Sequence, residues 1–182
     1  AFKKALTEGT LDVGLASDVS TVPYGSLVQV LREEEVFLAI SMFHPYALTH
    51  PSGTPITAEE VKTNFAGDSL LLSKKGASLR MIGDQFFDSC GFEPVAVCET
   101  NNISATRSMV AQNAGVAFIS ESCSVNRNHI AYYPLSPAMK RLNLVVRQKD
   151  WVLNEPEQAF MDHILNYFKQ NTEHPYLAEK YS

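Results

Sequence analysis

The stretch that decides the fold is residues 101–120, NNISATRSMVAQNAGVAFIS, which predicts a capped helix followed directly by a buried strand. Asn102 is placed to accept hydrogen bonds from the free N–H groups of the first helical turn. Asn113 and Gly115 favour a left-handed helix stop. Apolar side chains recur close to helical spacing at Ile103, Val110, Ala111 and Ala114.

The second half of this stretch predicts a strand in a parallel sheet. Residues 115–119 form a short, nearly all-apolar run with two β-branched side chains, as expected of a strand that is covered on both faces. Strand and helix patterns alternate without interruption from Leu70 to Ile119. Such alternation indicates right-handed crossovers and a parallel sheet with helices on both sides, and therefore an α/β fold.

Periodicity and turn signals place the remaining elements on either side of this core. Thr57 followed by Glu60 has the pattern of a capping box at a helix start. A helix that starts at Ser78 is predicted to end at Gly91. Further strands are predicted at 11–16, 26–32, 36–42, 70–73, 94–99, 132–135 and 142–147, and further helices at 2–7 and from 154 onward.

Length and composition indicate one compact unit or two small lobes. The chain has 182 residues, of which 45% are hydrophobic, so it can bury a core of ordinary size. Its formal net charge of −5 argues against this piece binding a nucleic-acid backbone by itself. No apolar run approaches the length of a membrane span and no signal peptide is seen, so a soluble, cytoplasmic protein without membrane partners is expected.

The reactive side chains do not form a recognisable catalytic or metal centre. The three cysteines, Cys90, Cys98 and Cys123, are expected to be reduced and partly buried, since an odd number in a chain with an ordinary core argues against a disulfide framework. Cys90 and Cys98, the only close pair, have no histidine at ligand spacing. His44 and His50 flank a proline-bearing loop and do not share a helical face. The sequence also lacks a nucleophile elbow, a phosphate loop and a dinucleotide fingerprint. We therefore predict no enzyme activity, no metal and no cofactor.

Two loops are the strongest candidates for a binding site. In an open α/β sheet, ligands bind beyond the carboxyl ends of strands, where loops enter helices with free N–H groups. Residues 73–78 and residues 99–103 both follow a predicted strand and open a helix. We expect a carboxylate or another small anion to bind there. The predicted contacts are Ser73, Gly76, Ala77, Ser78, Asn101, Asn102 and Ile103, although Ser78 and Asn102 could equally serve only as helix caps.

Three further residues follow other predicted strands and complete the candidate set. Ser17 and His44 could face the cleft from the other lobe, while Ser120 could line the floor of the pocket. His44 precedes Pro45 and could also be an ordinary turn residue. Arg80 and Arg107 lie inside helices and are expected to be solvated.

Several motifs occur in a fixed order and spacing over most of the chain. These are LDVGLA at 11–16, AGDSLLL at 66–72, the helix start GASLR at 76–80 and GFEP at 91–94. Together they resemble the effector-binding domain of LysR-type transcriptional regulators. The resemblance implies a two-lobed, periplasmic-binding-protein-like fold of type 2, with mostly parallel central sheets and a small-molecule effector between the lobes.

The resemblance also implies a domain organisation. One lobe would comprise residues 1–67 and 147–182, and the other residues 68–146. The family's amino-terminal helix-turn-helix, its linker helix and the first elements of the discontinuous lobe are not found in this chain, so DNA would be bound only through that missing domain. We expect a homodimer or tetramer. Cys90 and Cys98 do not occupy the cysteine positions of the family's peroxide-sensing branch, which match Ser78 and the vicinity of Phe87.

These observations predict a domain that senses a small, anionic metabolite and thereby controls DNA binding and transcription. Two alternatives remain open at this point. A solute-binding protein of a transport system would share the fold, and so would an enzyme acting on small acids.

Overall fold

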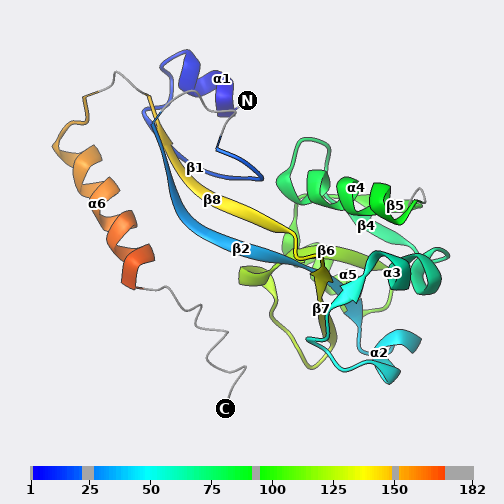
Figure 1. Ribbon diagram of the computed structural model, residues 1–182. Coiled ribbons are helices and arrows are strands. Elements are labelled where there is room, and N and C mark those ends of the chain that lie inside the picture. Colours follow the sequence, from blue (N-terminus) through cyan, green and yellow to red (C-terminus); the bar gives the residue numbers. More distant parts are fainter. Residues whose placement is uncertain (1, 22–26, 92–94, 149–151, 171–182) are drawn as a thin grey trace. The chain divides into compact units, whose positions relative to one another are not determined.

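The computed structural model describes residues 2–21, 27–91, 95–148 and 152–170 (Figure 1). Part of the predicted GFEP motif, residues 92–94, lies outside the described residues. The chain divides into two compact units. Unit 1 comprises Ala1–Glu33 and Leu142–Ser182, and unit 2 is the continuous segment Glu34–Arg141.

The described residues of unit 1 form two helices and three strand segments. Its helices are α1 (Phe2–Thr7) and α6 (Glu155–Gln170), and its strands are β1 (Val13–Asp18), the first part of β2 (Leu27–Ser41) and most of β8 (Lys140–Arg147). β1 and β8 pair in antiparallel fashion, with Val13 opposite Arg147. Leu6, Leu144 and Val146 form a small buried cluster in this unit, so α1 packs on β8.

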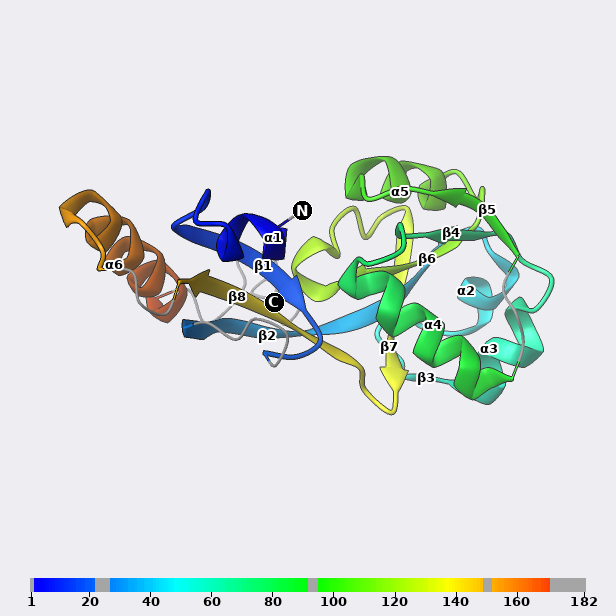
Figure 2. The same cartoon turned by 90° about the horizontal axis from the view of Figure 1, so that it is seen from above.

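Unit 2 is built on a mixed sheet (Figure 2). Within it, β4 (Leu70–Leu72) runs parallel to β5 (Ala96–Glu99) on one side and to β6 (Val116–Ser120) on the other. β2 then pairs antiparallel with β6 and with β7 (Ile130–Ser136). The short strand β3 (Ile56–Thr57) pairs parallel with β7.

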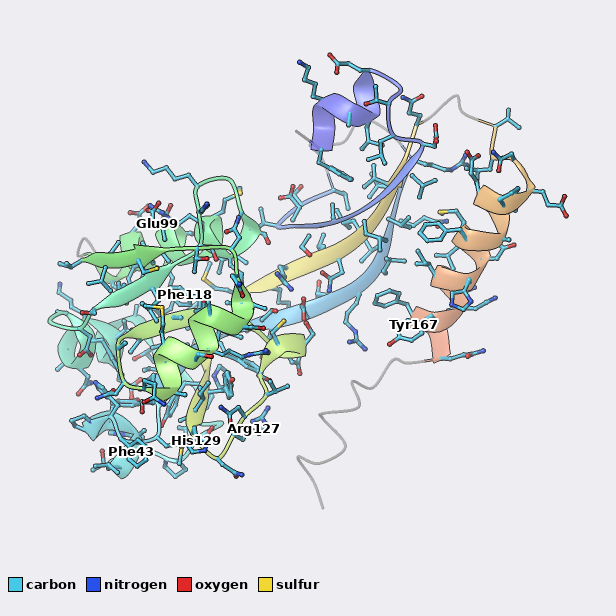
Figure 3. The ribbon with its side chains drawn as sticks, turned by 180° about the vertical axis from the view of Figure 1, so that it is seen from behind. Phe43, Glu99, Phe118, Arg127, His129 and Tyr167 are labelled. Carbon is cyan, nitrogen blue, oxygen red and sulfur yellow. The ribbon has the colours of Figure 1, made fainter. Side chains whose placement is uncertain are left out.

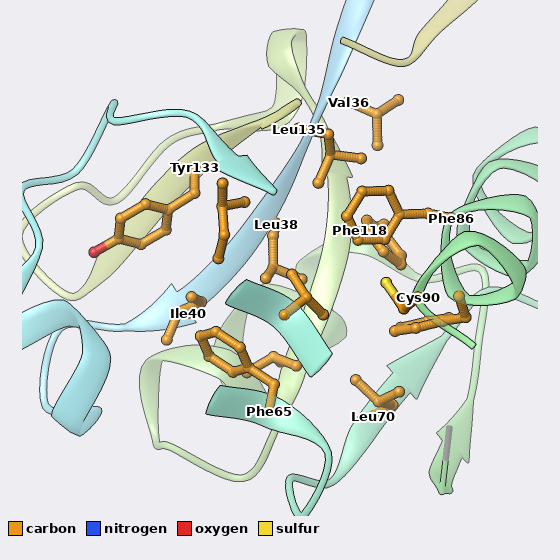
Figure 4. Packing of buried hydrophobic residues seen from close by; sticks show 14 of the residues in the cluster. Val36, Leu38, Ile40, Phe65, Leu70, Phe86, Cys90, Phe118, Tyr133 and Leu135 are labelled. Atoms are coloured by element: carbon orange, nitrogen blue, oxygen red, sulfur yellow. The ribbon is translucent and has the colours of Figure 1, made fainter. Parts of the chain in front are cut away.

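Helices cover both faces of this sheet. One face packs against α3 (Ala58–Phe65) and α4 (Ser78–Cys90), with the short α2 (Pro45–Thr49) beside them, and the other packs against α5 (Ile103–Ala111). Every residue of β6 is buried. In Figure 4, Phe118 of β6 lies against Phe86 of α4, with ring centroids 5.7 Å apart. The predicted α/β fold, with a strand covered on both faces, is confirmed.

Local signals in the sequence determine where several elements begin and end. Thr57 and Glu60 form the predicted capping box, in which each residue's side chain accepts a hydrogen bond from the other's backbone N–H. Asn102 caps α5 by accepting from the Ala105 N–H at 3.1 Å. Asn113 has φ 57°, as the predicted left-handed stop requires.

The structure differs from the prediction in β2. Two strands were predicted, at 26–32 and 36–42, but a single strand spans Leu27–Ser41. The residues between the two predicted strands, 33–35, are three consecutive glutamates that interrupt the apolar pattern. Glu34 nevertheless remains in the strand and is buried, because its carboxylate pairs with the guanidinium of Arg141.

The two units divide the chain at other residues than the lobes that the resemblance implies. Residues 34–67 were grouped with the amino-terminal segment, yet they belong to unit 2, where Leu38 and Phe65 share a core with Leu70. The chain passes between the units inside β2 and near the start of β8. The sheet is also mixed, since parallel pairing is confined in unit 2 to β5, β4, β6 and the short β3–β7 ladder.

None of the helices in the described ranges is long and apolar enough to cross a membrane.

Candidate functional site

A pocket of about 270 Å³ opens at the carboxyl ends of the three parallel strands of unit 2. Its volume lies just below the range of about 300–1,000 Å³ that is usual for small-molecule sites. We call it the strand-end pocket. It is lined by Leu71, Ser73, Ala77, Ser78, Leu79, Thr100, Asn101, Ile103, Thr106, Phe118, Ser120, Cys123 and Arg141.

The first wall of the pocket is the loop that joins β4 to α4. The N-cap of α4 is Ala77, which has no side chain able to accept a hydrogen bond from the first turn. Ser78 is the buried first residue of the helix, as predicted, and not its N-cap, which was the alternative. The N-terminus of α4 therefore has first-turn N–H groups that no side chain caps, and these groups favour an anion.

The second wall is the loop that joins β5 to α5, and here the backbone groups are satisfied internally. The Thr100 hydroxyl accepts from the Asn102 N–H at 3.1 Å, and Asn102 in turn caps the helix. Asn101 links the two loops, since its Oδ1 accepts from the Lys74 N–H at 2.9 Å. The two predicted anion loops are thus adjacent, but only the α4 loop lacks a side-chain cap.

Arg80 supports the first loop from outside the pocket. Its guanidinium donates to the Ser73 carbonyl at 3.3 Å, to Asp84 at 2.8 Å and to Glu99 at 2.6 Å. Glu99 lies at the end of β5 (Figure 3). The hydrogen bonds that Arg80 donates to Asp84 and Glu99 raise the pKa of its guanidinium. Arg80 is therefore a structural residue that ties β4 to β5, and the pocket does not include it.

The lining of the pocket combines apolar and polar side chains. Leu71, Ile103 and Phe118 supply hydrophobic surface from both faces of the sheet. Ser120 ends β6 and is 1% exposed, and its Oγ has no hydrogen-bond partner among the described residues. A buried hydroxyl without a partner costs free energy, so this atom is available to a bound molecule.

Arg141 is the one charged residue among those that line the pocket. Its Nε donates to Oε1 of Glu34 at 2.6 Å, while Oε2 of Glu34 accepts from the Ser122 N–H at 3.0 Å. The Glu34 side chain is 1% exposed and that of Arg141 is 15% exposed. The pocket therefore meets the cation of this pair, whereas the carboxylate is turned into the protein.

Six of the ten predicted contact residues line the strand-end pocket. They are Ser73, Ala77, Ser78, Asn101, Ile103 and Ser120. Gly76 and Asn102 lie in the same loops without lining the pocket. Gly76 has φ 87°, which a glycine adopts readily, and the Asn102 side chain is engaged as a helix cap.

Ser17 and His44 do not line this pocket. The Ser17 hydroxyl, in unit 1, donates to Oδ1 of Asn143 at 2.7 Å. His44 belongs to unit 2 but lies beside Gly115, at the other end of the parallel strands, where its Nε2 is 3.1 Å from Oδ2 of Asp68. Its Nδ1 accepts from the Tyr46 N–H and so caps α2, which agrees with the alternative of a turn residue.

The sequence did not indicate several residues of the pocket, above all Arg141. The apolar lining residues carry the same signal as any core residue. Arg141 directly precedes the predicted strand 142–147, and its pairing with Glu34 joins positions 107 residues apart. The one signal in the sequence was the position of Glu34 between two apolar segments, because a carboxylate that becomes buried there needs a cationic partner.

Metal binding finds no support in the described part of the chain, where no three potential ligands cluster. The three cysteines are free thiols, as expected. Burial raises the pKa of the Cys90 thiol. Cys123 lines the strand-end pocket, and Cys98 packs beside the adjacent core.

A family model described as the LysR substrate binding domain matches residues 1–169. Among curated proteins, the chain is 25% identical over 167 residues to an uncharacterized HTH-type transcriptional regulator, YybE, of Bacillus subtilis (strain 168). The match covers 91% of this chain and 54% of that protein, so the chain spans about half the length of the curated relative.

Solved structures with the same fold include two ligand complexes. The regulatory domain of CcmR from Synechocystis PCC6803, in complex with 2-PG, gives a TM-score of 0.74 at 17% identity, covering 93% of this chain and 79% of that one. The effector-binding domain of QuiR in complex with shikimate gives a TM-score of 0.69 at 16% identity, covering 93% and 78%.

Proposed function

Because the chain belongs to the family of LysR substrate-binding domains, we propose that it senses a small-molecule effector in the strand-end pocket and thereby controls transcription. The observation that carries this proposal is the composition of the pocket. It combines an uncapped helix N-terminus, a buried hydroxyl without a partner and one guanidinium at the ends of three strands. The described residues that line the pocket include no histidine and no carboxylate.

The effector in this proposal is a small anion. The α4 N–H groups and Arg141 both favour negative charge, and no acidic side chain lines the pocket in the part of the chain that the structure describes. The effector would act by binding one arrangement of the regulator more tightly than another, since only unequal affinity can shift an equilibrium. The DNA-binding domain of the whole protein, acting in a dimer or tetramer, would provide the readout.

Isothermal titration of the full-length protein against small carboxylates and amino acids tests this proposal. Operator binding is then measured by fluorescence anisotropy with and without each compound that binds. We expect at least one anion to bind and to change operator affinity. If no compound binds and operator affinity never changes, the proposed function is wrong.

A further inference from the structure

The geometry of the strand-end pocket contains information about the chemical class of its ligand. Arg141 is held at its Nε by Glu34, and no partner for its two η nitrogens is found among the described residues. These nitrogens carry four N–H donors in one plane, which suits the two oxygens of a carboxylate. Since both oxygens of Glu34 already accept hydrogen bonds, Glu34 fixes the guanidinium and leaves those donors for another acceptor.

Ser120 supplies the second part of the argument. Its Oγ is buried and unpartnered, and Ser120 comes from β6, whereas Arg141 comes from β8. A hydroxyl can donate and accept, so it can pair with a hydroxyl or a keto oxygen of a ligand. The lining also includes apolar side chains, among them Leu71 and Phe118. An inorganic oxyanion would leave that apolar surface without contacts.

We propose that the ligand is a small organic carboxylate that also carries a hydroxyl or keto oxygen, and that Arg141 selects its charge while Ser120 pairs with its second oxygen. Glu34 is a positioning residue that acts through Arg141. This inference rests on the proposed function for the identity of the site, but the role of Arg141 can be measured separately.

The charge selectivity of the pocket is tested without knowing the effector, because Cys123 lines it. The thiol is alkylated with anionic iodoacetate and with neutral iodoacetamide; each reaction forms a sulfur–carbon bond and releases iodide. Mass spectrometry then gives the ratio of the two rates at Cys123. Cys98, which does not line the pocket, is the internal reference.

Removing Arg141 alone would leave Glu34 as a buried, unpaired charge and could unfold the protein. The informative comparison is therefore E34Q, which keeps the guanidinium, with E34Q/R141M, which removes it. We expect the iodoacetate preference at Cys123 to fall about fivefold or more between these two variants. R127M removes a charge from unit 2 outside the pocket and is expected to leave the ratio unchanged. An unchanged ratio in folded E34Q/R141M would overturn the role of Arg141.

Ligand chemistry is tested by thermal-shift titration of the full-length protein with matched compounds. Lactate, pyruvate and mandelate carry both features, propionate and phenylacetate lack the second oxygen, and lactamide and mandelamide lack the charge. We expect stabilisation only by acids with the second oxygen, weakened about tenfold or more in E34Q/R141M relative to E34Q. Stabilisation by the amides, or by the acids regardless of Arg141, would contradict the inference.

The failure of this inference is distinguishable from failure of the proposed function. If a neutral compound alters operator binding, the sensing function stands and the ligand class is wrong. If no compound alters operator binding while the alkylation ratio follows Arg141, the anion site stands and the sensing function is wrong.

Discussion

The buried hydroxyl of Ser120 is predicted to lower the stability of the unliganded protein. Its Oγ is buried without a partner, so the unliganded protein bears a desolvation cost that alanine would remove. We predict that S120A raises the free energy of unfolding by about 1 kcal/mol in the absence of ligand. Urea unfolding followed by circular dichroism measures this. A lower stability of S120A would mean that the hydroxyl is satisfied within the folded protein.

Tyr132 makes the protein sensitive to alkaline pH. Its hydroxyl donates to the Val125 carbonyl at 2.5 Å, and burial raises its pKa to about 12. The folded state thus keeps a proton that the unfolded chain loses above pH ~10, so stability falls as pH rises from about 10 toward 12. This loss amounts to about 1.4 kcal/mol per pH unit for each such tyrosine.

The variant Y132F removes this titration. Between pH 10 and 11.5 the free energy of unfolding should fall less steeply with pH in Y132F. We expect the slope to differ by about 1.4 kcal/mol per pH unit, which corresponds to one proton. Tyr46, whose pKa is also raised to about 12 by burial, keeps its own contribution in that variant. An unchanged slope would show that Tyr132 does not titrate differently on folding.

Arg141 marks the limit of what could be predicted at the residue scale. Helix caps such as Asn102 and the Thr57–Glu60 pair depend on neighbours within four positions, and the sequence predicted them correctly. The pairing of Arg141 with Glu34 depends on two strands meeting across the sheet. No local pattern encodes such a contact, and for this reason the charged member of the pocket was missed.

At the scale of elements, the junction between α5 and β6 is the most constrained turn in unit 2. A Cβ on Gly115 would lie 2.5 Å from the carbonyl oxygen of Ser69, which also accepts the hydrogen bond of the Val116 N–H. An alanine would push β6 away from β4. We predict that G115A destabilises the protein by about 2 kcal/mol or more.

Gly67 provides the matched control for this substitution. A Cβ there would meet no atom within 4 Å, so G67A is expected to change stability by no more than about 0.5 kcal/mol. Thermal unfolding of the two variants side by side makes the comparison. Equal effects of G115A and G67A would rule out the steric explanation.

The elements themselves were largely predictable, and β2 shows why one was not. Strands β4 and β6 are short and apolar, so their composition is enough to identify them. In β2 the three consecutive glutamates at 33–35 interrupt the apolar pattern. In the folded chain Glu34 contacts Arg141 and the Ser122 N–H, which are both distant in sequence.

On the scale of the whole molecule, unit 2 is a continuous segment with its own core. Its hydrophobic clusters and the strand-end pocket are formed entirely by residues 34–141. We therefore predict that this segment, expressed alone, folds cooperatively, as expected of a domain with its own core. Circular dichroism melting and amide-proton dispersion in NMR spectra test this. A fragment without a cooperative transition would show that unit 1 is needed for folding.

The division into units was the least predictable feature. The boundary at residue 67 was implied by the resemblance to LysR-type effector-binding domains. The observed boundary at residue 33 depends on the pairing of β2 with β6 and β7. Such boundaries depend on which strands pair across long sequence separations. Local patterns in a single sequence do not show these pairings.

The central claim is that the strand-end pocket is the ligand site of this domain. NMR titration of the ¹⁵N-labelled chain with lactate, pyruvate and mandelate, each against its neutral amide, tests it most directly. We predict saturable, acid-specific shifts of the Ser78, Thr100 and Ser120 amides and of the Arg141 Nε–H. Shifts centred on Ser17 and Asn143 or on His44 and Asp68, or none at saturating concentrations of any acid, would contradict it.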